Sequence, residues 1–214
     1  MARVDDYMQA LALGRDALRE SNPDLLARFS GAEIRRGEEG KTMLSLGFLN
    51  DEITLSWPDL NSFSKKSGGE PPLQQQILLL HYLKGAWASS GAPVTGEWIA
   101  FQEVPDGRFY LDAFHRRAKH PLVQTFGNKP ERLVEIAAAA FGAVSLDRGD
   151  FSVMVQAFPL VPIALVLWKG DEEFPPEGNL LFDRNISRVL SAEDIAWLAG
   201  MVVYPLVGMA KAGG

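Results

Sequence analysis

The spacing of hydrophobic residues predicts helices in several parts of the chain. Apolar residues recur every three or four positions over residues 5–19, 73–87 and 130–141, which is the period of one helix face. In residues 73–87 the other faces are apolar too, so this helix is expected to be covered on several sides. Residues 110–125 also read as helical, with an interruption at Pro121.

Local capping signals mark where two further helices begin. Asn22 followed by Pro23 is typical of a helix start, because asparagine accepts a backbone N–H and proline needs no donor in the first turn. Ser191 followed by Asp194 resembles a capping box, with aspartate in place of the usual glutamate or glutamine. A short second helix and a final apolar helix are therefore expected.

Alternation of polar and apolar residues predicts strands elsewhere. Residues 32–36, 42–49 and 52–57 are three short runs whose brief connections favour an antiparallel meander. Residues 96–104 alternate in the same way, and residues 151–168 predict two paired strands joined by a tight corner. Because helices and strands do not alternate strictly, the sequence favours an α+β fold, with a largely antiparallel sheet packed against several helices.

The length of the chain fits one domain. A chain of 214 residues removes roughly 70% of its unfolded surface from water on folding. The clearest interruption is KKSGGEPP at residues 65–72, which predicts an exposed loop and is the best candidate for an internal boundary. We expect a single domain over residues 1–214, with helices and a meander in residues 1–64.

Composition and charge exclude several kinds of site. There is no cysteine, which excludes disulfides, thiolate zinc sites, cysteine-ligated iron–sulfur clusters and thiol catalysis. The formal net charge of −6 opposes binding to nucleic acid and to anionic membranes. Because the sequence shows no secretion signal and no apolar run near the ~20 residues of a membrane span, we expect a cytoplasmic protein.

Five carboxylates after a wholly apolar strand form the strongest polar signal. Asp171, Glu172, Glu173 and Glu177 lie in one turn, and Asp183 follows the next apolar run. Crowded carboxylates can bind a hard cation, or raise one pKa and supply a general acid. The spacing matches no calcium loop, and a solvated turn with Asp183 as a cap explains the same residues. Both interpretations stay open, and no dedicated metal site is predicted.

Two polar residues lie on the helix predicted at residues 73–87. His81 falls at the border of its apolar stripe, and Lys84 falls near the middle. They can contact an anionic ligand, and His81 can serve as a base or an axial metal ligand. The competing interpretation is a histidine at the edge of the core that its neighbours satisfy.

Basic and aromatic residues supply the remaining candidates. The basic run at residues 115–120 can hold phosphate or carboxylate, with Arg108 and Tyr110 as further donors, or form a solvated helix face. Trp98, Phe101 and Tyr110 can line an apolar ligand pocket or belong to the core. The sequence contains no P-loop, dinucleotide-binding fingerprint or nucleophile elbow.

An ordered series of motifs resembles a known family. The series runs through His81–Tyr82–Leu83, Gly96–Glu97–Trp98, Phe101, Pro105–Asp106–Gly107, Tyr110, Phe114, Phe158–Pro159, Pro162–Ile163, Gly170–Asp171–Glu172–Glu173–Phe174–Pro175, Leu181–Phe182–Asp183 and Glu193–Asp194. It is similar to the uncharacterised prokaryotic family called domain of unknown function 3786, over roughly residues 72–205. Members of that family occur largely in anaerobic bacteria and archaea. Some carry a cysteine-rich iron–sulfur module like that of corrinoid proteins, which this chain lacks.

We interpret the chain as an accessory protein that binds a small organic ligand in an aromatic-lined pocket; the resemblance implies a link to tetrapyrroles or corrinoids. The candidate ligand-binding residues are His81, Lys84, Trp98, Phe101, Tyr110, Asp171, Glu173 and Asp183. Two alternatives stay open: an enzyme that uses the 171–173 loop, with or without a metal, and a protein-interaction module. Neither nucleic acid nor a membrane is expected as a partner, and the sequence identifies no cofactor and no oligomeric state.

Overall fold

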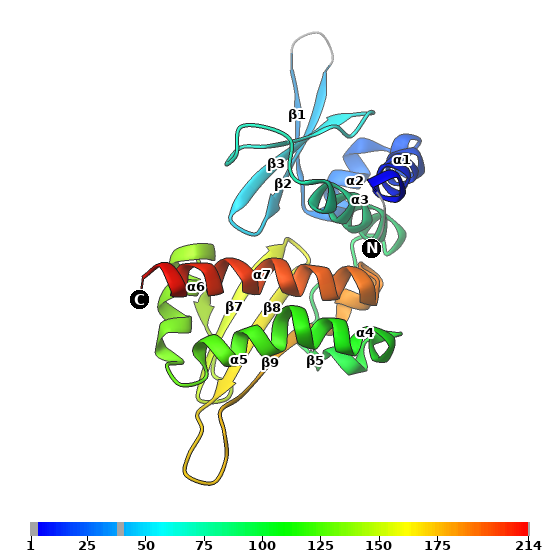
Figure 1. Ribbon diagram of the computed structural model, residues 1–214. Coiled ribbons are helices and arrows are strands. Elements are labelled where there is room, and N and C mark those ends of the chain that lie inside the picture. The colour runs from blue at the N-terminus through cyan, green and yellow to red at the C-terminus, as the bar shows by residue number, and fades with distance from the viewer. Residues whose placement is uncertain (1–3, 38–40, 214) are drawn as a thin grey trace. The chain divides into compact units, whose positions relative to one another are not determined.

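The computed structural model describes residues 4–37 and 41–213, which form an α+β fold with two antiparallel sheets, as the sequence predicts (Figure 1). The chain groups into two compact units. The N-terminal unit comprises Met1–Pro93, Phe158–Leu160 and Arg188–Leu190, and the C-terminal unit comprises Val94–Ala157, Val161–Ser187 and Ser191–Gly214. The division therefore falls after Pro93, and the 65–72 loop lies inside the N-terminal unit.

The helices of the N-terminal unit pack against one another. α3 (Leu73–Ala88) lies against both α1 (Val4–Arg19) and α2 (Pro23–Ser30). The Asn22 side chain accepts hydrogen bonds from two backbone N–H groups of the first turn of α2, at 2.9 and 3.1 Å, which confirms the predicted helix start. Half of the residues of α3 are buried, and they lie on more than one of its faces, as the apolar composition of the helix predicts.

The sheet of the N-terminal unit is a meander. β1 (Glu33–Arg36), β2 (Thr42–Phe48), β3 (Asp51–Trp57) and β4 (Ser62–Ser64) are neighbours in that order, each antiparallel to the next. The first three strands confirm the predicted meander, and β4 extends it. The loop after β4 is tied to β3, because the Asp51 carboxylate accepts a hydrogen bond from a backbone N–H of the loop at 3.0 Å.

Tyr82 of α3 connects distant segments within the N-terminal unit. Its ring stacks on Phe158, with the centroids 4.2 Å apart. Its hydroxyl donates to the carbonyl oxygen of Ser30 at 2.6 Å and accepts the N–H of Leu160 at 3.3 Å. Burial raises the pKa of Tyr82, so the phenol keeps the proton that it donates. This network gives a structural reason for the tyrosine in the first motif of the series.

The C-terminal unit contains a five-stranded sheet. In spatial order its strands are β5 (Trp98–Ala100), β9 (Glu177–Asp183), β8 (Val161–Trp168), β7 (Phe151–Phe158) and β6 (Val144–Ser145). β8 lies inside the sheet and is buried except at Trp168, as the apolar pattern predicts. The strand predicted at residues 96–104 is wrong beyond Ala100, because the chain turns there into a short 3₁₀ helix (Phe101–Glu103).

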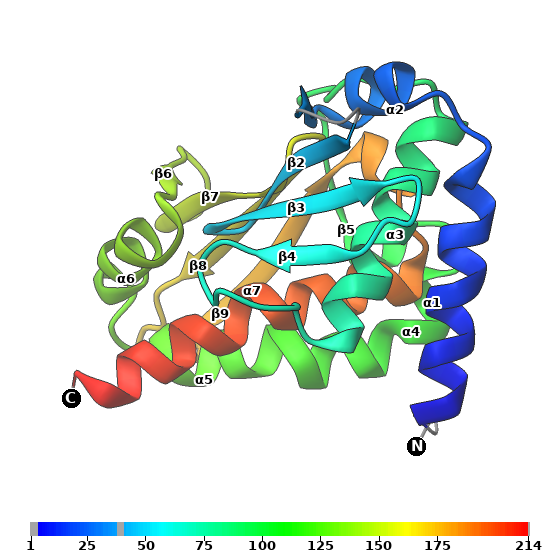
Figure 2. The ribbon, with the colours of Figure 1, turned by 90° about the horizontal axis from the view of Figure 1, so that it is seen from above.

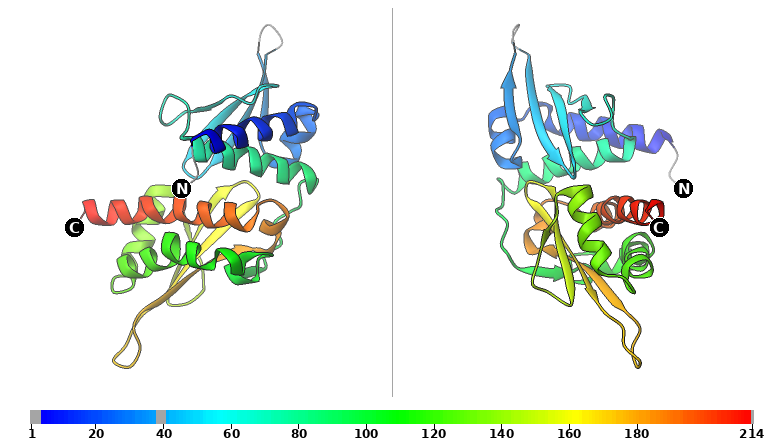
Figure 3. Two further views of the ribbon diagram at one scale, coloured as in Figure 1. Left: turned by 45° about the vertical axis from the view of Figure 1, so that its right-hand side comes forward. Right: turned by 90° about the vertical axis from the view of Figure 1, so that its left-hand side faces the viewer.

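Helices cover one face of this sheet (Figures 1 and 3). The helical segments are α4 (Gly107–Phe114), a π turn (His115–Lys119), α5 (His120–Phe126), α6 (Glu131–Phe141) and α7 (Ala192–Ala212). Figure 2 shows α4 and α5 running side by side with α7, and each of them contacts α7. α4 begins at Gly107, shortly after the 3₁₀ turn, in which Phe101 is buried whereas Gln102 and Glu103 are exposed.

The interruption predicted at Pro121 appears as the π turn. Proline inside an α-helix lacks an N–H and crowds the carbonyl group four residues earlier. Here the N–H of His120, directly before the proline, bonds the carbonyl oxygen of His115 five residues back. This wider turn lets the helix continue through Pro121 instead of ending there.

α7 is long and apolar enough to cross a membrane by length and composition alone. Its 21 residues have a mean hydropathy of 1.5, and half of the apolar window is buried within the structure. Buried helices of globular proteins meet the same criterion, so this indication is weak. α7 begins at the predicted capping box, in which Ser191 Oγ accepts the N–H of Asp194 at 3.2 Å. The cytoplasmic location stays a prediction.

Candidate functional site

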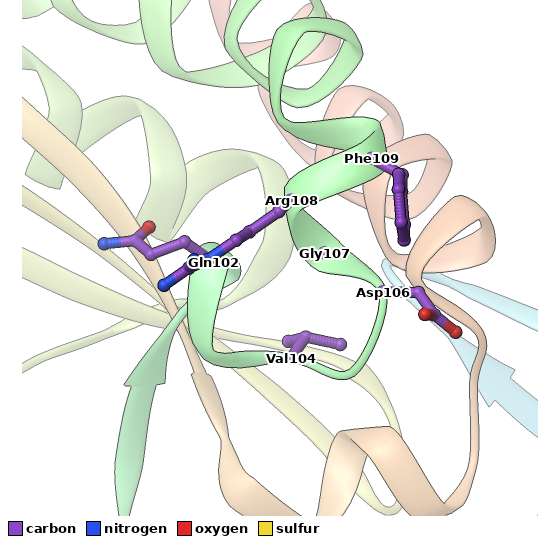
Figure 4. Close-up of a pocket in the computed structure, with 6 residues that line it drawn as sticks. All are labelled: Gln102, Val104, Asp106, Gly107, Arg108 and Phe109. Atoms are coloured by element: carbon purple, nitrogen blue, oxygen red, sulfur yellow. The ribbon is translucent and has the colours of Figure 1, made fainter.

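A pocket of about 400 Å³ opens at the start of α4 (Figure 4). It is lined by Gln102, Val104, Asp106, Gly107, Arg108 and Phe109. Val104 and Gly107 are buried and form an apolar base, whereas the other four side chains are exposed. The pocket is therefore open to solvent and offers three polar side chains and one aromatic ring to a ligand.

A compact set of backbone contacts shapes this pocket. The 3₁₀ turn is closed where the Glu103 carboxylate accepts the N–H of Ala100 at 2.7 Å. The N–H of Gly107 then bonds the carbonyl oxygen of Val104 at 2.9 Å. A Cβ atom on Gly107 would lie 2.2 Å from the carbonyl oxygen of Phe101, so only glycine allows this close approach. Phe101 anchors the turn from below, as its ring stacks on Phe114 at 4.3 Å.

The polar side chains of the pocket are available to a ligand. Figure 4 shows Arg108 extending toward Gln102, while Asp106 and Phe109 lie on the opposite side. Within residues 4–37 and 41–213, no hydrogen bond or ion pair is seen for these three polar side chains. Asp106 has a left-handed backbone conformation with φ of 61°, and its carboxylate does not cap the helix that follows. Aspartate tolerates this conformation, and the Asp106 carboxylate is left free to contact a ligand.

Phe109 is the most exposed large hydrophobic residue in the described chain. Its side chain is 86% exposed, although it lies only two residues from Gly107 at the buried base of the pocket. Leaving an aromatic ring in water forgoes roughly 1.5–3 kcal/mol of burial free energy. A ligand that covers this ring would recover part of that free energy.

The aromatic residues predicted to form a pocket do not line this one. Phe101 is fully buried between Phe114 and Phe182, and it belongs to the core. Trp98 and Tyr110 are half-buried and lie on either side of the pocket residues in the sequence. The three aromatic residues therefore lie close to the pocket in the sequence but do not line it.

His81 and Lys84 lie on α3, in the N-terminal unit, whereas the other candidate residues lie in the C-terminal unit. His81 is half-buried, which agrees with its place at the edge of the apolar stripe. Lys84 is exposed, so its expected position within the apolar stripe is wrong. The face of α3 that carries Lys84 is exposed to solvent.

Asp183 is fully buried and is satisfied by the chain itself. Its carboxylate accepts hydrogen bonds from the N–H and hydroxyl of Thr95, from the N–H of Gly96 at 2.6 Å, and from the N–H of Asn185 at 3.0 Å. Burial alone would raise the pKa of Asp183, but these hydrogen bonds outweigh it and lower the pKa. Asp183 therefore ties the entry to β5 to the end of β9, and its carboxylate has little left to offer a ligand.

Asp171 forms a turn at the tip of the β8–β9 connection. Its Oδ1 accepts the N–H groups of Glu173 and Phe174, both at 2.8 Å, and these bonds lower the pKa of Asp171. Asp171, Glu173 and Asp183 do not converge, because the first two precede β9 and Asp183 ends it, roughly 20 Å further along the strand. Within the described part of the chain, no group of three or more potential metal ligands is placed to hold an ion.

The basic run at residues 115–120 is engaged by its own unit. Lys119 Nζ lies 2.8 Å from Glu177 Oε1, and the Arg117 guanidinium lies over the Trp197 ring. Burial, together with the charges of Lys119 and His120, lowers the pKa of His115. The π turn thus packs part of the basic run against β9 and α7, and Arg108 lines the pocket instead of joining it.

The sequence interpretation missed Gln102, Asp106 and Phe109. Pro105–Asp106–Gly107 stands in the motif series, so one signal for Asp106 was present. Aspartate before a glycine at a helix start is usually read as a cap. Only the structure shows that this carboxylate makes no cap and that Phe109 faces solvent.

Comparisons with known proteins agree with the motif series. The model of the family described as Domain of unknown function (DUF3786) matches residues 22–204. This match begins fifty residues before the predicted start near residue 72, so it also covers α2 and the meander. Comparison with curated proteins and with solved structures finds no match. Because the match covers most of the chain, the protein belongs to the family described as a domain of unknown function, DUF3786.

Proposed function

We propose that this protein binds a small organic ligand in the pocket at the start of α4. The observation that carries the proposal is an exposed aromatic ring, Phe109, and an arginine without a partner among the described residues, Arg108, which line opposite sides of one pocket of about 400 Å³. Arginine recognises carboxylate and phosphate groups, and an exposed aromatic ring covers a flat apolar group. The ligand class that these side chains support is a compact organic acid with an apolar body.

The size of the pocket narrows the ligand further. About 400 Å³ lies toward the lower end of the range for small-molecule sites, roughly 300–1,000 Å³. A compact molecule suits this space better than the large macrocycle of a tetrapyrrole or corrinoid. The separation of Asp171 from Asp183 also favours the binding role over an enzyme built on the acidic loop.

Protein interaction is the second candidate function. It is favoured by Phe174, which is 67% exposed at the β8–β9 tip, and by Trp168, which is 40% exposed at the end of β8. Exposed aromatic residues at a protruding hairpin are common anchors of protein interfaces. The hairpin projects from the sheet of its unit in Figures 1 and 3.

Benzoate supplies a direct test of the proposed pocket, because it combines one carboxylate with one ring. In an NMR titration at low ionic strength we expect benzoate to shift the backbone amides of residues 102–109. Phe109→Ala is expected to weaken binding about threefold to tenfold, since an aromatic pair contributes roughly 0.5–1.5 kcal/mol. Arg108→Gln is expected to weaken it by a comparable factor.

The chain offers matched controls for both substitutions. Phe174→Ala removes another exposed phenylalanine of the same unit, and Arg116→Gln removes an exposed arginine two turns further along the helical segment. Both controls should bind benzoate as the wild type does. Equal affinity in Phe109→Ala and Phe174→Ala, or shifts confined to other segments, would contradict the proposed pocket.

A further inference from the structure

We infer that the ligand of the α4 pocket is dipolar: a small molecule with an acidic group at one end, an amino group at the other and a flat apolar body. This inference rests on the proposed function and names its ligand class. It follows from the separation of charge within the pocket, which binding of an organic acid alone does not require.

The first observation is that the two charged residues of the pocket lie on opposite sides of it. Arg108 extends toward Gln102, and the Asp106 carboxylate lies on the other side together with the Phe109 ring (Figure 4). No ion pair joins Asp106 and Arg108 in the part of the chain that the structure describes, so both charges are open to a ligand.

The second observation is that the chain gives Asp106 no role of its own. A polar residue before a helix caps the first turn from an extended backbone conformation, as Asn22 and Ser191 do at the starts of α2 and α7. Asp106 is left-handed instead, and its side chain makes no capping hydrogen bond. Its carboxylate is thus held at the edge of the pocket without an intramolecular partner.

The third observation is the apolar floor between the two charges. Val104 and Gly107 are buried at the base of the pocket, and the Phe109 ring stands beside Asp106. A ligand with only an acidic group would satisfy Arg108 but lie near the unpaired Asp106 carboxylate, and a simple amine would have the reverse problem. A zwitterion with an apolar body satisfies both charges and covers the ring.

Three compounds of similar shape separate these possibilities: 4-(aminomethyl)benzoate, 4-methylbenzoate and 4-methylbenzylamine. They share a para-substituted ring and differ in carrying both charges at opposite ends, only the acid or only the amine. We expect 4-(aminomethyl)benzoate to bind about twofold to fivefold more tightly than either of the others, because an exposed charge pair contributes at most about 1 kcal/mol. The shifts should again map to residues 102–109.

Two substitutions should have opposite effects on this preference. Asp106→Asn keeps a residue that tolerates positive φ, and it should abolish the advantage of 4-(aminomethyl)benzoate over 4-methylbenzoate while preserving the advantage over 4-methylbenzylamine. Arg108→Gln should do the reverse. Arg116→Gln should leave both preferences unchanged.

The outcomes separate the two proposals. If 4-methylbenzoate binds the wild type as tightly as 4-(aminomethyl)benzoate, or 4-(aminomethyl)benzoate does not bind, the dipolar ligand is overturned while benzoate binding still supports an acid-binding pocket. If benzoate also fails to shift residues 102–109, the proposed function itself is overturned.

Discussion

Replacing Asp183 with alanine is expected to lower the free energy of unfolding by roughly 3–5 kcal/mol. The substitution removes the buried carboxylate that accepts the N–H groups of Thr95, Gly96 and Asn185, and it leaves the buried N–H of Asn185 without this acceptor. A hydrogen bond to a charged group contributes about 1.5–3 kcal/mol, and a buried donor without a partner costs about 1–3 kcal/mol. Urea denaturation followed by circular dichroism measures the change.

Lowering the pH should reveal the contribution of the Asp183 carboxylate to the stability of the wild type. The pKa of Asp183 in the folded protein is lower than its ordinary value of 3.8, so folding favours the ionised form. The contribution of Asp183 is therefore fully present above the unfolded pKa and is lost as the pH falls through the folded pKa. The unfolding free energy of Asp183→Ala should depend less on pH below about 4 than that of the wild type.

Glu97→Ala is the matched control for Asp183. Glu97 pairs with Arg184 next to the same junction, but both side chains are mostly exposed. Exposed ion pairs contribute about 0–1 kcal/mol, so this variant should stay close to the wild type. Similar losses in Glu97→Ala and Asp183→Ala would show that burial of the Asp183 carboxylate does not matter.

Gly85→Ala, in α3, is expected to lower the free energy of unfolding strongly. A Cβ atom at this position would lie 1.8 Å from the carbonyl oxygen of Val189, and a backbone atom cannot rotate away as a side chain does. Alanine ordinarily stabilises a helix relative to glycine by about 1 kcal/mol. Here we expect a net loss of about 3 kcal/mol or more, because overpacking against backbone forces the segments apart.

The opposite change in stability is expected for Gly208→Ala in α7. No atom lies within 4 Å of a Cβ built at this position, so only the helix propensity changes. We expect a gain of roughly 0.5–1 kcal/mol in the free energy of unfolding. Urea denaturation of both variants measures the two changes in the free energy of unfolding. A Gly208→Ala variant less stable than the wild type, together with a Gly85→Ala variant as stable as the wild type, would contradict the packing described for these glycines.

The elements that the sequence predicted correctly are those fixed by local signals. Asn22 and Ser191 mark helix starts because their side chains bond the backbone within three residues. The buried strand β8 was recognisable because seven of its eight residues are apolar and buried. Pro121 predicted an irregular turn, although the sequence did not show that the helix would continue through it.

The features that the sequence did not predict depend on contacts between distant segments. Asp183 looked like a candidate site residue, since nothing in its neighbourhood shows that Thr95 and Gly96 would supply donors from another part of the chain. The strand predicted at residues 96–104 ends at Ala100, where the chain turns into a 3₁₀ helix and the carbonyl oxygen of Phe101 comes close to Gly107. No local signal marks Phe109, whose exposure is a property of the fold.

Native mass spectrometry of the protein purified from its own source tests ligand binding at the α4 pocket most directly. We predict that the wild type and Phe174→Ala carry an added mass of a small organic molecule. A double variant, Arg108→Gln with Phe109→Ala, should show the mass of the polypeptide alone. A wild-type spectrum without an added mass, or the same added mass on the double variant, would contradict the account.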